Sequence, residues 1–267
     1  MILSFLNSFR LLDSGLNFSR RYQCMVLPLI LLPVCPASVA DAGSGLNWSI
    51  TPYLWATETK VKLKAMGTPV GEGRVTFDDL VDVTDSSFQI VTEAATQSGK
   101  WSFFADVTHI DMSDTSEREF TRIDTTSEQW LADAAFSYWP RGEVAGFSLF
   151  VGARYIDLND RFDFKLSENK QALIALENQR DFLDALIGLR QRFTLSERWS
   201  LFTRGDYSRG DSDGIFQLQA TFRYALGHDQ QYGLVFGYRY KEARFKYNAL
   251  EERNKYYGPL LGFNLRF

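Results

Sequence analysis

The residue of this sequence best suited to acid–base chemistry is His109, which has Asp111, Ser113 and Asp114 close by. A positioned histidine can act as a general base that activates water or a hydroxyl group. However, no serine lies one or two residues from His109 in the pattern that lipases use. A hydrolase based on His109 is therefore the alternative hypothesis, and a residue at an ordinary strand end is the preferred interpretation.

Two acidic segments resemble cation sites, but both fit turns or loops better. Asp211 to Gly214 begins like a calcium loop, yet the remaining ligands and the closing glutamate are absent. The Asp-Gly pair supplies the positive φ of a hairpin turn and accounts for this segment. Four aspartates between Asp78 and Asp85 lie in a long segment where acidic side chains are commonly solvated. We therefore expect no metal site and no cofactor.

Regularly spaced charges give the most informative candidate site. They occupy every second position of the strands predicted below and are expected to face the interior: Glu93, Asp106, Asp133, Arg154, Asp184, Arg190, Arg192, Arg204, Asp206, Arg223, Arg239 and Lys241. Five of these lie about five or six residues from the same strand end: Glu93, Asp106, Asp133, Arg190 and Arg204. At ~3.3 Å per residue and a tilt near 45°, these five form one layer roughly 12 Å above that end.

The order of the strands predicts an acidic wall opposite a basic wall in this layer. The three acids come from strands two to four, and the two arginines from strands six and seven. In a narrow interior they would meet as Arg–carboxylate pairs and close it. In a wider interior they would leave a charged constriction. Barrels with few strands are packed by side chains, which favours the filled interior.

The elements that position these residues are strands, as the C-terminal segment shows most clearly. From Tyr232 to Tyr240 every second residue is apolar or aromatic, and a second such row runs from Tyr257 to Phe267. A period of two over this length indicates a strand with two differently solvated faces. The aromatic ending at Phe267 resembles the terminal strand of Gram-negative outer-membrane barrels, which the barrel-assembly machinery reads.

We predict an antiparallel transmembrane barrel with ten strands, and eight or twelve are the alternatives. The strands are expected at 46–57, 87–97, 101–113, 122–139, 146–158, 180–195, 199–210, 215–226, 232–247 and 254–267. Short connections on one side alternate with mostly longer ones on the other, as periplasmic turns and outer loops do in such barrels. Trp48, Trp101, Trp139 and Trp199 all lie near the periplasmic end, as one aromatic belt requires. A soluble β-sandwich would not sort its tryptophans in this way.

The longer connections contain further predicted elements. The 29 residues of 58–86 are too many for a simple connector. Alternation from Lys60 to Ala65 predicts a strand pair that projects beyond the membrane and turns near Gly67. Phe77 to Val83 is predicted to form a short helix, and Gln171 to Gln179 a second one.

Residues 1–40 are interpreted as a signal peptide. Arg20 and Arg21 precede an apolar run from Met25 to Val34, and Ser38 to Ala40 supplies the small residues that a signal peptidase requires. The run of about ten residues is too short for a membrane-spanning helix. A lipoprotein signal with Cys35 as the modified residue is the alternative, but Val34 is bulky where a small residue is preferred.

The remaining chain, 41–267, forms the predicted barrel domain and excludes several function classes. Three of the 29 basic residues and one of the 33 acidic residues lie in the leader, which leaves 26 against 32 and a net charge of −6. An acidic chain without basic clusters argues against nucleic acid as a partner. Both cysteines, Cys24 and Cys35, also lie in the leader, so no disulfide framework or thiol chemistry is expected.

Several short motifs together resemble a family of Gram-negative outer-membrane β-barrel proteins without an assigned function. They are Ile50 to Ala56 (ITPYLWA), Phe77 to Leu80 (FDDL), Gly99 to Trp101 (GKW), Gly152 to Tyr155 (GARY), Gly237 to Tyr240 (GYRY) and Gly258 to Phe263 (GPLLGF). The chain departs from the family pattern at Asp181 to Ala185 and at Gly205 to Gly214. The resemblance implies fold and location but supplies no catalytic residues.

The sequence therefore predicts a monomeric, non-enzymatic protein of the cell outer membrane. It would act as a scaffold that presents extracellular loops or as a narrow passage for small polar solutes. Its expected partners are outer-membrane lipid, lipopolysaccharide and the barrel-assembly machinery, the last through the strand that ends at Phe267.

Overall fold

The computed structural model describes residues 45–117, 121–142, 146–166, 172–247 and 250–267. The predicted signal peptide, residues 1–40, lies outside the described residues. Within these ranges no helix is long and apolar enough to cross a membrane.

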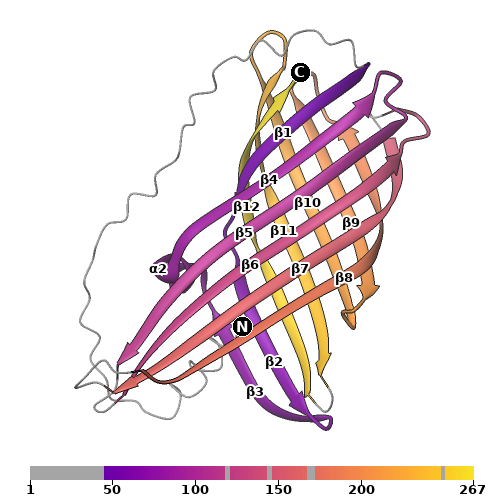
Figure 1. The fold of residues 1–267 in the computed structure, drawn as a ribbon. Coiled ribbons are helices and arrows are strands. Elements are labelled where there is room, and N and C mark those ends of the chain that lie inside the picture. The colour runs from indigo at the N-terminus through magenta and orange to yellow at the C-terminus, as the bar shows by residue number, and fades with distance from the viewer. Residues whose placement is uncertain (1–44, 118–120, 143–145, 167–171, 248–249) are drawn as a thin grey trace.

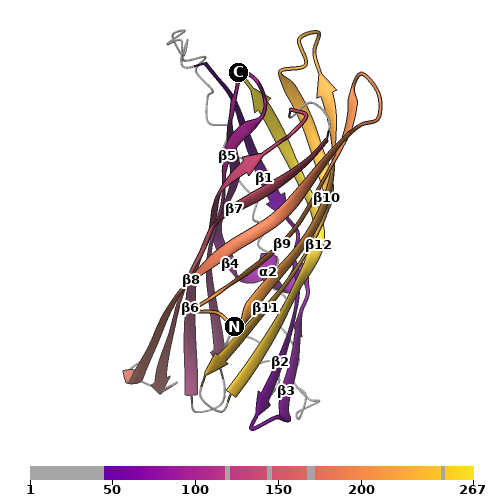
Figure 2. The same ribbon diagram turned by 90° about the vertical axis from the view of Figure 1, so that its right-hand side faces the viewer.

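Among the described residues, ten antiparallel strands close into a barrel, as predicted (Figures 1 and 2). They are β1 (Leu46–Trp55), β4 (Thr84–Thr96), β5 (Trp101–Glu117), β6 (Thr121–Tyr138), β7 (Gly146–Leu166), β8 (Ala172–Thr194), β9 (Trp199–Gly210), β10 (Gly214–Leu226), β11 (Tyr232–Tyr247) and β12 (Leu250–Arg266). Each strand pairs with its neighbour in chain order, and β12 returns to pair with β1. The short turns and the C terminus lie at one end, which is the periplasmic end in barrels of this kind.

The segment between β1 and β4 forms a projecting hairpin and a helix, in agreement with the sequence prediction. Strand β2 (Glu58–Ala65) continues along β12 in the same register as β1, so that Leu54 pairs with Leu261 and Lys60 with Lys255. Met66 and Gly67 have φ of 51° and 78°, and this left-handed turn leads into β3 (Thr68–Val75). Helix α2 (Phe77–Val83) follows and begins with a capping box.

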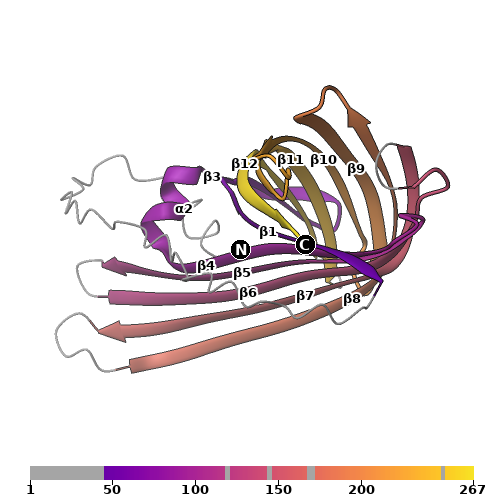
Figure 3. The same ribbon diagram turned by 90° about the horizontal axis from the view of Figure 1, so that it is seen from above.

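Several strands are longer than predicted and extend well beyond the membrane zone. The segments 114–121 and 159–179 were predicted as loops, but their described parts belong to β5 to β8. The helix predicted at Gln171 to Gln179 is also wrong, because β8 starts at Ala172. Helix propensity is a weak tendency, and here the pairing of β8 with β7 satisfies the backbone groups instead. Viewed from above, β4 to β8 form one broad wall, and β9 to β12 curve round opposite it (Figure 3).

The outer surface of the barrel is apolar and its interior is polar, the reverse of a soluble protein. Large apolar side chains of successive strands point outward and are exposed, among them Leu149, Val151, Leu218, Leu234 and Leu261. The alternate residues are buried inside and include many charged groups. Such a closed barrel satisfies every backbone hydrogen bond between strands, so this surface can face lipid.

The periplasmic tryptophan belt contains three of the four predicted members. Trp48, Trp101 and Trp199 are exposed on the outer face. Trp139 instead points inward and is fully buried, where its Nε1 donates a hydrogen bond to Ser102 at 3.2 Å. All four residues lie near the periplasmic end as predicted, but Trp139, directly after β6, continues the inward row of Asp133, Ala135 and Ser137.

Replacement of Leu261 by arginine tests the lipid-facing assignment. Leu261 is 62% exposed between Leu54 and Phe236 on the outer face. We expect Leu261→Arg to lower the free energy of unfolding by about 2–4 kcal/mol at mid-depth in a bilayer. The control is Met66→Arg at the tip of the β2–β3 turn, where residue 66 is 86% exposed and the change should stay within about 0.5 kcal/mol. Urea unfolding of both variants in lipid vesicles measures this, and equal stabilities would show that the assigned facing is incorrect.

Candidate functional site

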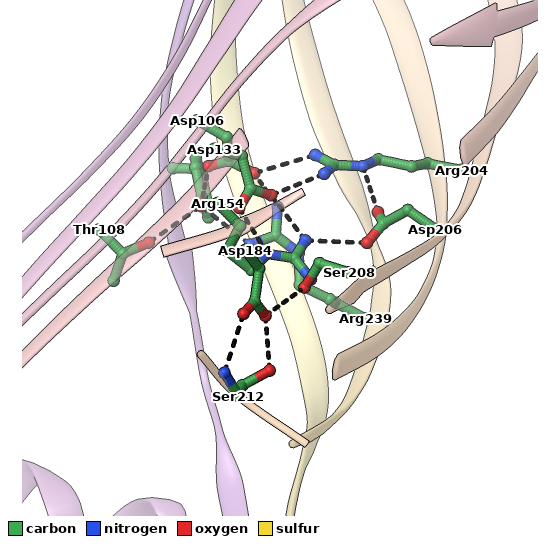
Figure 4. Close-up of polar contacts among 11 residues, drawn as sticks. Asp106, Thr108, Asp133, Arg154, Asp184, Arg204, Asp206, Ser208, Ser212 and Arg239 are labelled. Carbon is green, nitrogen blue, oxygen red and sulfur yellow. Dashed lines mark hydrogen bonds and ion pairs between the residues drawn. The ribbon is translucent and has the colours of Figure 1, made fainter. Parts of the chain in front are cut away.

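The centre of the barrel holds three arginines and three aspartates, which we call the central ion cluster: Asp106, Asp133, Arg154, Arg204, Asp206 and Arg239 (Figure 4). These residues come from β5, β6, β7, β9 and β11, so the cluster links opposite walls of the barrel. All six are buried. Their formal charges cancel, which a dry interior requires of ionised groups.

Arg204 joins three carboxylates from three strands. Its Nη2 lies 2.6 Å from Asp133 Oδ2, its Nε 2.6 Å from Asp206 Oδ2, and its Nη1 3.5 Å from Asp106 Oδ2. Arg204 and Asp206 are neighbours on the inner face of β9, whereas Asp106 and Asp133 lie across the lumen. The planar guanidinium, with five donors in a fixed geometry, is suited to such a junction.

Arg154 forms the tightest pair of the cluster. Its Nε and Nη2 donate to the two oxygens of Asp133 at 2.6 and 2.8 Å, a bidentate arrangement. Nη2 also contacts Asp206 at 2.8 Å, and Nη1 donates to Ser208 Oγ at 3.3 Å. Only 1% of Arg154 is exposed.

Arg239 connects the cluster to the first strand. Its Nη2 donates to Asp106 Oδ2 at 3.1 Å and its Nη1 to the Tyr53 hydroxyl at 2.9 Å. Tyr53 in turn donates to Asp106 Oδ1 at 2.6 Å. The guanidinium also lies 4.9 Å from the Tyr53 ring centroid and 5.2 Å from that of Trp55. Residues of β1, β5 and β11 are therefore held together across the lumen.

Asp184 extends the polar network toward the β9–β10 turn. It accepts hydrogen bonds from Ser208 Oγ at 3.0 Å, Ser212 Oγ at 2.5 Å and Ser212 N at 3.0 Å. Gly214, which ends this turn, has a φ of 125°. The segment that begins like a calcium loop is thus a hairpin turn anchored by a buried carboxylate.

A second ion pair lies nearer the periplasmic end. Arg190 Nη1 and Nη2 both contact Glu93 Oε1 at 2.7 Å, and Ser102 donates to the same oxygen at 2.9 Å. The Phe104 ring contacts both groups, with the Arg190 and Arg204 guanidinium carbons 4.5 and 5.0 Å from its centroid.

In the structure the five residues expected in one layer meet as Arg–carboxylate pairs, Glu93 with Arg190 and both Asp106 and Asp133 with Arg204. These pairs fall into two groups, because Arg204 also contacts Asp206 whereas Arg190 contacts Glu93 alone among the carboxylates of the five. Arg154 on β7 and Asp206 on β9 mix the two signs of charge within each wall. Heights counted from strand ends miss this, because the stagger between neighbouring strands is not visible in the sequence.

Three further predicted residues also lie inside the barrel. The Arg192 guanidinium lies 5.5 Å from the Trp139 ring centroid and 5.9 Å from that of Phe202. Arg223 donates to Asn264 Oδ1 at 2.8 Å near the periplasmic end. Lys241 is buried beside Gln217, its register partner on β10.

Apolar side chains fill the lumen on both sides of the central ion cluster, which the sequence analysis did not anticipate. The upper apolar layer lies on the extracellular side and consists of Ile156, Leu158, Phe182, Ile215, Ala243 and Phe245. The lower apolar layer consists of Phe104, Ala135, Phe150 and Leu186. These residues occupy the same inward rows as the charges. Apolar residues at inward positions of the sequence could therefore have predicted the two apolar layers.

Gly188 makes room for the lower apolar layer. It faces the lumen between its register partners Phe150 and Asp206. A Cβ at this position would lie 2.3 Å from the Phe150 ring and 2.7 Å from the Asp206 Cβ. Because both neighbours are packed, only glycine allows the ring and the carboxylate to lie side by side.

His109 lies away from this network, on the outer face of β5. Its ring packs against Trp130 at an interplanar angle of 42° with centroids 4.2 Å apart, and its Nε2 lies 3.3 Å from Glu128 Oε1. The alternate residues Asp106 and Thr108 face the lumen. In the part of the chain that the structure describes, no group of three or more His, Cys, Asp or Glu residues could hold a metal ion.

Comparison with known proteins identifies the fold. No protein-family model matches the sequence, and no curated protein matches it. Among solved structures, the outer membrane protease OmpT from Escherichia coli matches with a TM-score of 0.53 at 11% identity, covering 85% of this chain and 98% of that one. Ail, the attachment invasion locus protein of Yersinia pestis, matches with a TM-score of 0.40 at 12% identity, covering 83% and 99%. With its apolar outer face, this fold makes the chain an outer-membrane β-barrel protein.

Removal of Arg204 tests the energetic weight of the central ion cluster. Arg204→Ala leaves Asp106, Asp133 and Asp206 with fewer partners in a dry interior, and we expect a loss of roughly 3–5 kcal/mol in unfolding free energy. Arg209→Ala on the same strand is the matched control, because its pair with Asp213 is 3.8 Å long and exposed, and it should cost less than about 1 kcal/mol. Urea unfolding in detergent micelles measures both. A wet, loosely packed lumen would instead give similar values for the two variants.

Proposed function

We propose that the protein is a non-enzymatic outer-membrane scaffold with a closed lumen, whose function resides in its extracellular sheets. The observation that supports this proposal is the central ion cluster, in which the arginines are paired directly with carboxylates across the barrel. A passage for polar solutes, the other expectation from the sequence, would need those groups to be free for the solute.

The energetics of the lumen favour closure. A solute that crosses must separate Arg–carboxylate pairs, and breaking one partner from a buried pair is strongly unfavourable. It must also pass the upper and lower apolar layers, and an apolar constriction excludes water and ions by dewetting. The two kinds of barrier lie in series along the barrel axis.

The form of the extracellular part favours a scaffold. Strands β7 and β8 have 21 and 23 residues, about twice the 9–11 residues that span a membrane. The β2–β3 hairpin adds two strands to the sheet of β12 on the same side. A surface built on paired strands holds its side chains at fixed spacing, which suits recognition better than a mobile loop does.

The hydrolase alternative based on His109 receives less support. Its contacts are with Trp130 and Glu128 on the outer face, and it stands apart from the lumen carboxylates. The protease activity printed for OmpT belongs to that protein, and at 11% identity the likeness carries no catalytic residue to this chain.

Conductance of the purified protein in a planar bilayer tests the closed scaffold. We expect no discrete conductance steps, because the paired charges and the two apolar layers block the axis. A porin added to the same bilayer is the positive control for insertion and detection. Reproducible unitary steps that Arg204→Ala alters in ion selectivity would overturn the proposal in favour of a narrow passage.

A further inference from the structure

The outer face of the sheet formed by β11, β12, β2 and β3 carries a concentration of positive charge. Side chains here follow the same outward rows as the lipid-facing residues below them. Register places them in three successive cross-strand rows: Glu242, Lys255, Lys60 and Arg74, then Arg244, Arg253, Lys62 and Glu72, then Lys246, Glu251 and Lys64. We call these residues, together with Glu58 just below, the basic face.

The charge of the basic face is opposite to that of the whole chain. It has eight basic and four acidic residues, a net charge of +4, whereas the chain has −4. The residues between them point inward and are buried, including Val61, Ala243 and Asn254. The charged side chains are largely exposed, for example 60% for Arg74 and 57% for Arg244.

The acids of this face orient the basic groups. Glu242 accepts hydrogen bonds from Arg244 and Arg253, both at 2.8 Å, and from Tyr240 at 2.9 Å. Burial raises the pKa of Glu242, but these hydrogen bonds outweigh it and hold the pKa at about 2. Glu58 is likewise held by Arg74 and by the Tyr257 hydroxyl. The carboxylates therefore stay ionised and fix the positions of the arginines beside them.

Two lysines of the first row remain available for an external anion. The ion pairs of the face use Arg74, Lys62, Arg244, Lys246 and Arg253. Lys60 and Lys255 are cross-strand neighbours, and the Lys60 ammonium lies 5.2 Å from the Tyr257 ring centroid.

The height of the basic face matches the headgroup region of the outer leaflet. Tyr238, Tyr240 and Tyr257 lie directly below it on the outer surface, and the exposed leucines Leu234 and Leu261 lie below these. Tyrosines mark the membrane interface because their rings are apolar and their hydroxyls are polar. The first basic row thus begins where the hydrocarbon zone ends.

The outer face of the opposite sheet carries acidic residues above the membrane. On β5 to β8, the outward residues above the membrane include two register pairs, Asp111 with Glu128 and Asp157 with Asp181. An anionic ligand in the outer leaflet would therefore be attracted to one side of the barrel and repelled from the other.

We propose that the basic face binds the phosphate groups of the outer-leaflet glycolipid, of the lipopolysaccharide class. Arginines can hold a phosphate in a bidentate manner, and lysines add point charges. The lipid source fits better than a soluble anion because the face stands immediately above the tyrosines, where lipid phosphates are concentrated. This inference is independent of whether the lumen is closed.

The experiment uses the folded barrel in detergent micelles, titrated with bis-phosphorylated lipid A, and compares two double variants. Lys60→Gln/Lys255→Gln removes two positive charges from the basic face and leaves its ion pairs intact. Arg161→Gln/Arg209→Gln removes two exposed extracellular charges elsewhere and is the matched control. Each basic residue near an anionic surface raises the affinity about fivefold, so the first variant should bind lipid A roughly 30-fold more weakly than the parent. The control should bind like the parent, and thermal unfolding verifies that both are folded.

Three outcomes would overturn the assignment. Equal binding of lipid A by the two double variants would show that the basic face is not the binding site. Equal binding of dephosphorylated lipid A would show that the acyl chains alone are recognised. Competition by inorganic phosphate at the same concentration as lipid A would point to a soluble anion. Two results together would support the proposal. The parent protein should lose its binding in high salt, and it should bind phosphorylated lipid A more tightly than the dephosphorylated form.

Discussion

Charge pairing among buried groups in the lumen is the constraint on which this structure depends. Three arginines and three aspartates meet inside a barrel whose outside is apolar, so none of them can turn to water. Each ion is tolerable only because an opposite charge from another strand lies within hydrogen-bond distance. The barrel must therefore close with a definite stagger, since a shift by one residue along any strand would send its charges to the lipid side.

The stacking of layers along the axis follows from the same constraint. The upper and lower apolar layers lie on either side of the central ion cluster, and burial in such surroundings strengthens the pairs within it. Phe104 contributes twice, because its ring belongs to the lower apolar layer and also faces the Arg190 and Arg204 guanidinium groups. Tyr53 brings the first strand into the cluster through Asp106 and Arg239. Apolar layers and ion pairs thus alternate along the barrel axis.

Much of the fold could be predicted from the sequence, because a period of two distinguishes the apolar face of a strand from its polar face. That rule located ten strands, the inward charges and the turn at Gly67. It could not locate strand ends in the extracellular part, where the alternation breaks down, as the run of apolar residues from Ala172 to Leu176 in the mistaken helix shows. It placed acids opposite arginines but could not say which carboxylate meets which arginine. Glu93 with Arg190, and Asp133 with both Arg154 and Arg204, depend on stagger and on barrel width, which the sequence does not state.

The collinear arrangement of β1 and β2 along β12 has a consequence for the order of folding. The contacts at this seam join residues about 200 positions apart, such as Leu54 with Leu261 and Lys60 with Lys255. Contacts so distant in sequence carry the largest loop-closure entropy and form last. The seam extends beyond the membrane, because β2 of the hairpin continues it along β12. Strand pairing can therefore begin in the extracellular part and proceed toward the membrane-spanning part. Once paired, β1 and β2 together contact β12 over a far greater length than a seam confined to the membrane would provide.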